Sequence, residues 1–299
     1  MTSILIPPGI GDQYWVLVKL QSFMRREQIR APKITVVCTP DDQWKGHLRS
    51  IPFLKRFSFL KIADPSWVAN DPELYPQYLE AYSRIGQTIW PNFQGFDYFI
   101  AYNGILNGGG SLETADIDLA CNWYPQMTYS QIEMDTAKQY REKYGKYVCF
   151  YWPFFGTFEN HIREYPIENI VKAIKLFLTE FDATPIFIGS QTDVGINDLL
   201  IDLMSQFPEA VDLVGKLSLD ETFGVVKGSE MVVGYHSGLT NMAVVFKKKT
   251  ILLWSNYLPK SIALNCVPPD RFQKTYFPLY CQDIDVDKFY QTMCDVYRS

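Results

Sequence analysis

The sequence predicts an α/β protein made of two halves of similar size. Short apolar runs, which are typical of buried strands, alternate with longer amphipathic runs, and this alternation favours parallel sheets covered by helices. The alternation restarts near Gly145. The chain has 299 residues, 47% of them hydrophobic, which is enough for two domains at roughly 100–200 residues per domain. We therefore expect domains at residues 1–145 and 146–299, with a crevice between them.

In the first half, each strand is a short apolar run and each helix shows apolar residues three and four positions apart. The expected elements, in order, are a strand at Ser3–Ile6, a helix at Asp12–Glu27, strands at Lys33–Cys38 and Phe57–Ile62, a helix at residues 71–87 and a strand at residues 96–104. The segment Leu112–Pro125 has no clear period, so we expect an irregular connection there.

The second half repeats the pattern more regularly. We expect a helix at Ser130–Tyr144, then strands beginning near residues 146, 184, 210, 230 and 250, with helices at residues 167–181, 196–207, 219–229, 238–248 and 285–297. The last helix has a strong apolar face, and its packing back onto the first domain is left open. Because ligands of open α/β sheets bind at the carboxyl ends of strands, the loops that follow strands are the places to look for function.

The first such loop is Gly9-Ile10-Gly11-Asp12, between the first strand and the first helix. Glycines let the backbone approach a ligand closely, and the N–H groups of a helix start attract negative charge. Asp12 has two interpretations: a helix N-cap, or a carboxylate held at the mouth of a pocket. Tyr14 occupies the third glycine position of the dinucleotide-binding pattern, so a dehydrogenase is not favoured.

The second loop lies within "GYHSGLTNMAVVF", residues 234–246. A strand ends there, a His-Ser-Gly turn follows and a helix begins. The N–H groups of Ser237, Gly238 and Leu239 would form a cradle for a phosphate, with His236 as an additional donor. The alternative is that Ser237 only caps the helix and that His236 is a half-buried structural residue.

The stretch "LVGKLSLDETFGVVKGSEMVVGYHSG" resembles the C-terminal signature of glycosyltransferase family 9, the ADP-heptose:lipopolysaccharide heptosyltransferases. The positions that match are Gly215, Ser218-Leu219, Glu221, Ser237-Gly238 and Ala243. The Gly-x-Gly-Asp start, the strand "FDYFIAYNG" and the helix start "HIREYPIE" resemble other segments of that family, in the same order. Two positions depart from it: His236 stands where the family has Asp, and Asn241 where it has His.

The resemblance implies a fold of the GT-B type, with two Rossmann-like domains that face each other across a cleft. The first domain would bind the acceptor and the second the nucleotide sugar, and the reaction would invert the anomeric centre without a metal or cofactor. The implied roles are catalysis by Asp12, as general base, and His236; diphosphate binding by Gly11, Arg163, Ser237, Gly238 and Leu239; nucleoside binding by Gly189, Asp220 and Glu221; and acceptor binding by Asn103 and Gly104.

The net charge of the chain does not decide the class of acceptor. The net charge of −5 implies no broad basic face, which gives no support to an acceptor in duplex DNA. We consider a glycan or lipid-linked acceptor, the modified bases of viral DNA, and a nucleotide-sugar-binding protein without catalysis. The last is suggested by His236 and Asn241.

Composition predicts a cytoplasmic protein that has no signal peptide or transmembrane segment and for which peripheral membrane contact is left open. The six cysteines are scattered and are expected as reduced, mostly buried thiols. The Asp-x-Asp pairs at Asp116/Asp118 and Asp283/Asp285 are expected to be solvated rather than to bind a metal. Tryptophans such as Trp152 and Trp254 are expected mostly in the core, with stacking on a sugar or base as the alternative for Trp254, which lies at a strand end.

Overall fold

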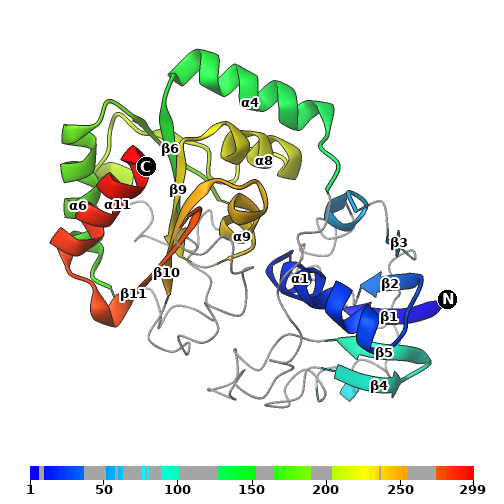
Figure 1. Ribbon diagram of the computed structural model, residues 1–299. Helices are drawn as coiled ribbons and strands as arrows, with labels where there is room; N and C mark the ends of the chain where they lie inside the picture. The colour runs from blue at the N-terminus through cyan, green and yellow to red at the C-terminus, as the bar shows by residue number, and fades with distance from the viewer. Residues whose placement is uncertain are drawn as a thin grey trace. The chain divides into compact units, whose positions relative to one another are not determined.

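The computed structural model describes residues 1–6, 10–36, 52–57, 60–62, 76–77, 80, 89–100, 127–152, 165–189, 204–235, 237–254 and 274–299. These residues form two compact units, the first up to Thr128 and the second from Tyr129 onward (Figure 1). Each unit has its own sheet. The sequence predicts a boundary after residue 145, which differs from this division by one helix, α4 (Gln131–Tyr144). Helix α4 lies in the second unit because it packs along α8 (Leu219–Gly228).

The sheet of the first unit has five strands in the order β3-β2-β1-β5-β4. Their bounds are β1 Thr2–Ile6, β2 Pro32–Val36, β3 Lys61–Ile62, β4 Ile89–Phe93 and β5 Phe96–Ile100. The central strand β1 runs parallel to β2 and β5, and its last three residues are fully buried. Helix α1 (Ile10–Arg26) follows β1, and its first residue lies two positions before the start that the sequence predicts.

The edge strand β4 is a departure from the parallel sheet that the sequence predicts. It pairs antiparallel with β5 through a two-residue turn at Gln94 and Gly95, both of which have positive φ. A turn with positive φ at both central residues matches the right-handed twist of a hairpin, and it favours glycine at the second position. Pro91 within β4 obscures the strand in the sequence, but an edge strand tolerates proline because one of its sides is unpaired.

The second unit has a fully parallel sheet of six strands in the order β11-β10-β9-β6-β7-β8. Their bounds are β6 Tyr147–Tyr151, β7 Thr184–Phe187, β8 Val211–Asp212, β9 Met231–Tyr235, β10 Lys249–Trp254 and β11 Tyr276–Tyr280. Counted within the unit, the order is 6-5-4-1-2-3, which is the strand order of the Rossmann fold read from its other edge. The α/β class predicted from the alternation is therefore confirmed.

Helices cover both faces of this sheet. One face packs against α6 (Ile167–Glu180) and α11 (Val286–Arg298), which also contact each other. The other face packs against α8 and α9 (Gly238–Val245), and α4 lies along α8 (Figure 1). The strand order explains this division of the helices between the two faces. Crossovers between parallel strands are right-handed, so those that lead toward opposite edges of the sheet place their helices on opposite sides of it.

The last helix is held within the second unit. Glu180, at the end of α6, accepts hydrogen bonds from Tyr290 and forms an ion pair with Arg298, both on α11. Phe289 and Met293 on α11 are fully buried in the core that α6 also lines. The packing of this helix, which the sequence analysis leaves open, is therefore against α6.

Strand β11 is absent from the sequence-based assignment. Its sequence, Tyr-Phe-Pro-Leu-Tyr, carries a proline and no alternation of polar and apolar residues. It pairs with β10 in register from Thr250 to Trp254 and closes one edge of the sheet. As with β4, an edge position explains why proline is accepted there.

Two glycines on α8 allow it to approach α4 closely. A Cβ atom on Gly224 would lie 2.6 Å from the carbonyl oxygen of Glu133 on α4, and one on Gly228 would lie 3.0 Å from that of Ala137 on α4 and 2.1 Å from the hydroxyl of Tyr147 on β6. Tyr147 donates that hydroxyl to the carbonyl of Val225 at 2.7 Å, inside the core. The spacing of four residues places both glycines on the same face of the helix.

We expect Gly224→Ala to lower the free energy of unfolding by about 1–3 kcal/mol, because the added methyl group has no room. At an open helix position the same change stabilises by up to about 1 kcal/mol, so the sign of the effect is diagnostic. Urea denaturation measures it, with Lys172→Ala on the exposed side of α6 as the control. A Gly224→Ala protein as stable as the wild type would contradict the close packing.

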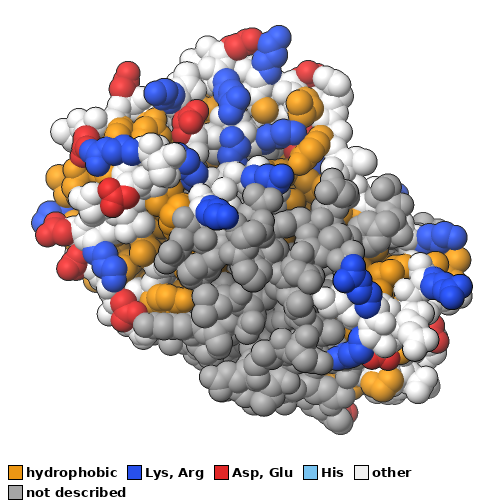
Figure 2. All heavy atoms as spheres, in the orientation of Figure 1, with side chains coloured by type: hydrophobic (Ala, Val, Ile, Leu, Met, Phe, Trp, Pro, Cys, Tyr) orange, Lys and Arg blue, Asp and Glu red, His pale blue; other side chains and the backbone are white. Residues whose placement is uncertain are grey.

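The surface is mixed in charge. Figure 2 shows lysine, arginine and acidic side chains interspersed over the second unit. Some cations have structural partners: Arg141 donates to the carbonyl of Gly228 and Lys248 to that of Ser229, so both satisfy carbonyls at the end of α8. Among the described residues, no helix combines the length and apolar character needed to cross a bilayer. The described cysteines, Cys149, Cys281 and Cys294, are buried free thiols.

Candidate active site

Strand order locates a ligand site in each unit. In the second unit the order reverses between β6 and β9, which lie side by side although about eighty residues separate them in the sequence (Figure 1). In the first unit the corresponding point lies between β1 and β5. Ligands of open α/β sheets bind outside the carboxyl ends of the strands at such a point. The two loops singled out in the sequence, at Gly9–Asp12 and at residues 236–239, follow β1 and β9 respectively.

The carboxyl ends of β6 and β9 are closely packed against each other. Tyr151 pairs with Gly234, and a Cβ atom on Gly234 would lie 2.1 Å from the carbonyl oxygen of Tyr151. One residue further along, the rings of Trp152 and Tyr235 contact each other edge to face, with centroids 5.9 Å apart. Both rings are buried in the core that α6 and α11 also line.

Helix α9 begins immediately after this edge with a capping box. The N–H of Ser237 donates to the hydroxyl of Thr240 at 2.8 Å, and the N–H of Thr240 donates to the hydroxyl of Ser237 at 3.4 Å. Thr240 also donates its hydroxyl to the carbonyl of Tyr235. The N-cap interpretation of Ser237 is therefore confirmed, and its N–H already has an acceptor.

Two backbone donors remain at the start of α9. The N–H groups of Gly238 and Leu239 occupy the first two positions of the helix, where no acceptor exists within the helix itself. Both residues are half-buried. These donors lie at the positive end of the helix dipole, which is equivalent to roughly half an elementary charge. The arrangement suits an anionic group such as a phosphate.

Helix α8 starts with a second capping box, which the sequence analysis does not identify. Glu221 accepts the N–H of Ser218 at 2.8 Å, and Ser218 accepts the N–H of Glu221 at 3.3 Å. The side chain of Ser218, as the largest cause, and its backbone N–H both bond to the Glu221 carboxylate and hold the pKa of Glu221 below its usual range. The spacing Ser-x-x-Glu before an apolar run is the sequence signal for this motif. Asp220 lies half-buried in the same turn.

Gly189 lies just past β7 and is buried. Its carbonyl accepts the N–H of Gly215 at 3.1 Å, which ties the end of β7 to the turn that follows β8. Gly215 has φ of +70°, a conformation that favours glycine. The structure thus brings Gly189 close to the chain that leads into α8.

Helix α8 follows β8 along the chain and α9 follows β9, and β6 and β7 lie between those two strands in the sheet. The strands β8 and β9 are therefore three strand spacings apart, about 14 Å.

In the first unit, Gly11 and Asp12 are the second and third residues of α1. The N-cap interpretation of Asp12 is therefore wrong: the helix begins at Ile10, before the aspartate rather than after it. A carboxylate in the first turn is favoured by the helix dipole. The side chain of Asp12 lies outside the described part of the structure, as do the residues Asn103, Gly104, Arg163 and His236.

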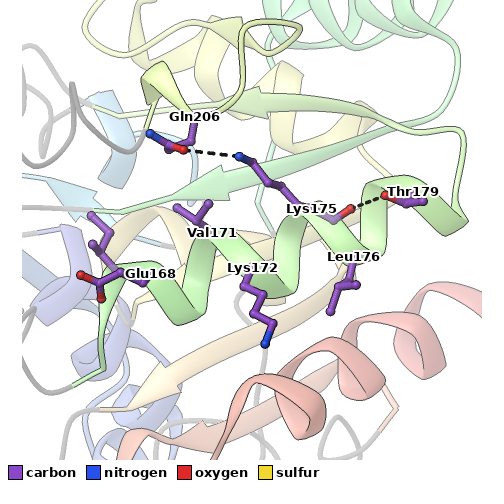
Figure 3. Close-up of a pocket in the computed structure, with 8 residues that line it drawn as sticks. Glu168, Val171, Lys172, Lys175, Leu176, Thr179 and Gln206 are labelled. Atoms are coloured by element: carbon purple, nitrogen blue, oxygen red, sulfur yellow. Dashed lines mark hydrogen bonds between the residues drawn. The ribbon is translucent and has the colours of Figure 1, made fainter.

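A shallow groove runs along the outer face of α6 (Figure 3). Its lining is formed by Ile167, Glu168, Val171, Lys172, Lys175, Leu176, Thr179 and Gln206. Lys175 donates to the side-chain oxygen of Gln206 at 3.4 Å, so the polar groups of the groove partly satisfy each other. The groove follows a helix rather than the carboxyl ends of strands and includes none of the residues that the sequence analysis assigns to a site.

Solved structures of similar fold cover the whole chain. The E. coli ADP-heptose lps heptosyltransferase II matches with a TM-score of 0.62 at 15% identity, over 100% of this chain and 99% of its own. A family 9 glycosyltransferase of Veillonella parvula matches with a TM-score of 0.60 at 11% identity, over 99% and 97%. The chain has the fold of these glycosyltransferases.

A third structure, the E. coli heptosyltransferase WaaC with ADP-2-deoxy-2-fluoro heptose, matches with a TM-score of 0.54 at 12% identity, over 98% and 99%. No family model and no curated protein matches the sequence. The predicted GT-B fold type is confirmed, and the resemblance to family 9 that the motifs indicate agrees with these matches.

We expect Ser218→Ala to destabilise the protein by about 1 kcal/mol at neutral pH, because it removes the N-cap of α8. Since Glu221 has a lowered pKa, its contribution is complete above the usual value of 4.5 and is lost as the pH falls through the lowered value. The difference in unfolding free energy between wild type and variant therefore shrinks in acid.

Denaturant unfolding from pH 7 to pH 3 measures this difference. Glu221→Gln is the matched control, because its amide oxygen still accepts the N–H of Ser218 but does not titrate. A Glu221→Gln protein whose stability falls in acid as steeply as that of the wild type would contradict the capping role of the Glu221 carboxylate.

Proposed function

We propose that the protein is a glycosyltransferase that moves a sugar from a nucleotide-diphosphate donor to a hydroxyl group of an acceptor. Two independent features support this: the fold, which matches sugar transferases over the whole chain, and the family 9 motifs. The observation that carries the proposal is the start of α9, where the N–H groups of Gly238 and Leu239 lack helical acceptors at the switch point of the second sheet.

The diphosphate of the donor binds at this helix start. As the bond to the sugar breaks, negative charge grows on the departing phosphate oxygen. Backbone donors and a helix dipole that are already aligned stabilise that charge more strongly than they stabilise the ground state, which lowers the barrier. In the proposal Arg163 and His236 add donors to the diphosphate, and Gly11 also contributes to its binding.

The nucleoside extends toward α8. Gly189 lies beneath it, and Asp220 and Glu221 accept hydrogen bonds from the ribose hydroxyls. The capping box is compatible with this role, because an ionised carboxylate has about four acceptor sites and the N–H of Ser218 occupies one of them. Because the strands that precede the two helices, β8 and β9, are about 14 Å apart, an extended ligand such as a nucleotide sugar suits this arrangement.

Asp12 is the proposed general base. It removes the proton from the acceptor hydroxyl as that oxygen attacks the anomeric carbon, and the single displacement inverts the centre. Asn103 and Gly104, which follow β5 in the sequence, hold the acceptor. No metal is required in this scheme, because the helix dipole and cationic side chains neutralise the leaving group. The acceptor class, the cytoplasmic location and peripheral membrane contact stay predictions.

The diphosphate site is tested with two variants at one position. Gly238→Pro removes the N–H at the first position of α9. Proline is well tolerated at that position, and the preceding residue, Ser237, has the extended backbone that a following proline requires. Gly238→Ala adds a similar Cβ but keeps the N–H. We expect the proline variant to bind the nucleoside diphosphate roughly 10- to 100-fold more weakly than the alanine variant, the loss typical of a hydrogen bond to a charged group.

Thermal-shift screening of the wild type with ADP, UDP, GDP and CMP, and with their sugars, identifies the nucleotide, because a ligand of the folded state raises the melting temperature. Titration calorimetry then compares the two variants. Equal affinities of Gly238→Pro and Gly238→Ala would show that this N–H does not contact the ligand.

Asp12→Asn tests the chemistry separately. We expect turnover to fall by about 10²- to 10⁴-fold with an unchanged dissociation constant for the donor, because only proton transfer is lost. The assay follows release of the nucleoside diphosphate in the presence of candidate acceptors, with and without EDTA. Full turnover of Asp12→Asn would remove this residue from the mechanism, and loss of wild-type turnover in EDTA would refute metal independence.

A further inference from the structure

The hydroxyl of Thr240 joins the start of α9 to the end of β9. It accepts the N–H of Ser237 at 2.8 Å, and it donates to the carbonyl of Tyr235, the last residue of β9, at 3.1 Å. The carbonyl of Ser237 lies at the same distance from this hydroxyl but already accepts the N–H of Asn241. A hydroxyl has one proton and two acceptor sites, so one oxygen atom can hold the strand end and the N-cap residue together.

Burial makes these two hydrogen bonds hard to replace. Thr240 is 0% exposed, and a buried N–H or carbonyl that loses its partner costs free energy because no water takes its place. The hydroxyl binds the central sheet on one side and the residue that caps the helix on the other. A single side chain therefore fixes where α9 begins relative to β9.

The orientation of the two remaining backbone donors depends on the same contacts. Gly238 and Leu239 lie between Ser237 and Thr240, which are the two residues that the capping box joins. A hydrogen bond weakens steeply as its donor turns away from the acceptor, and a misplacement of about 1 Å in a site can cost about 100-fold. Loss of the Thr240 hydroxyl would let these N–H groups turn away from a bound anion.

Thr240 also caps the helix without adding negative charge. At the same position of their capping boxes, α4 has Glu133 and α8 has Glu221, and Glu or Gln is usual in this motif. The first turn of α9 contains no acidic residue. A carboxylate there would repel an anion at the positive end of the helix, whereas a hydroxyl leaves that end uncompensated.

We propose that Thr240 is a positioning residue for the diphosphate. Its hydroxyl holds the start of α9 at the end of β9, and in this position the N–H groups of Gly238 and Leu239 bind the phosphate oxygens. The inference rests on the proposed function. It gives Thr240 a role in binding that it exerts through the backbone, without touching the ligand itself.

The test compares two substitutions of Thr240. Thr240→Val replaces the hydroxyl with a methyl group of similar size, so the shape is kept and both hydrogen bonds are lost. Thr240→Ser keeps the hydroxyl and loses the buried methyl group, so it lowers stability without removing those bonds. The probes are inorganic pyrophosphate and the nucleoside diphosphate that the thermal-shift screen identifies, and titration calorimetry measures their affinities.

Thr250→Val is the matched control. Thr250 is also 0% exposed and its hydroxyl also donates to a backbone carbonyl, that of Lys248 at 2.9 Å. It is the second residue of β10, so it lies at the amino end of that strand, away from the carboxyl edge. The same atoms are exchanged in both valine variants.

We expect Thr240→Val to bind both probes roughly 10-fold more weakly than wild type, and Thr240→Ser and Thr250→Val to bind them normally. A purely structural role would lower the melting temperature of the ligand-free protein and leave the affinities unchanged. Unchanged or tighter binding by Thr240→Val, or an equal loss in Thr240→Ser, would overturn the inference and leave the proposed function intact. A wild-type protein that binds neither probe would overturn both.

A second pair covers the case in which Thr240→Val does not fold. Thr240→Ala and Thr240→Ser differ only in the hydroxyl oxygen, and alanine is the residue that best favours a helix. We expect the alanine variant to bind the probes roughly 10-fold more weakly than the serine variant. Equal affinities of these two variants would contradict the positioning role of the hydroxyl.

Discussion

The close contact of β6 with β9 is the constraint on which the second unit depends. These strands meet at the centre of the sheet, where Gly234 leaves room for the carbonyl of Tyr151 and for nothing larger. The contact fixes the point at which the strand order reverses, and with it the faces on which α6 and α9 lie. It also fixes where the loops after β6 and β9 emerge, so the place of the proposed diphosphate site follows from the packing of one glycine.

Capping boxes decide which groups are left for a ligand. Helices α4, α8 and α9, which lie on one side of the sheet, each begin with a serine whose hydroxyl accepts the N–H three residues later. At α9 this motif occupies the N–H of Ser237 and leaves those of Gly238 and Leu239. At α8 it occupies part of the Glu221 carboxylate. The same residues therefore serve the fold and the proposed site, and their two roles are separable because they use different atoms.

Close packing and satisfied polar groups go together where α4 meets α8. Gly224 and Gly228 bring the helices together there, and the hydroxyl of Tyr147 and the carbonyls at the end of α8 have partners. Elsewhere some buried polar atoms have no partner among the described residues, including those of Trp152 and Asn241 in the second unit and Trp90 in the first. Unsatisfied buried groups are therefore not confined to the switch point.

The sequence by itself determined the α/β class, the two-part organisation and most elements of the second unit, because hydrophobic periodicity records burial directly. It also located the loops after β1 and β9, since glycine and serine at a strand-to-helix junction have a local meaning. Strands β4 and β11 could not be predicted, because their prolines are acceptable only at a sheet edge, and edges exist only once strands have paired. The capping box of Ser218 and Glu221 is local and could have been found from its spacing. The assignment of α4 to the second unit, by contrast, depended on tertiary structure, because it rests on a contact between segments far apart in the chain, whereas a sequence pattern reports only on a residue and its near neighbours.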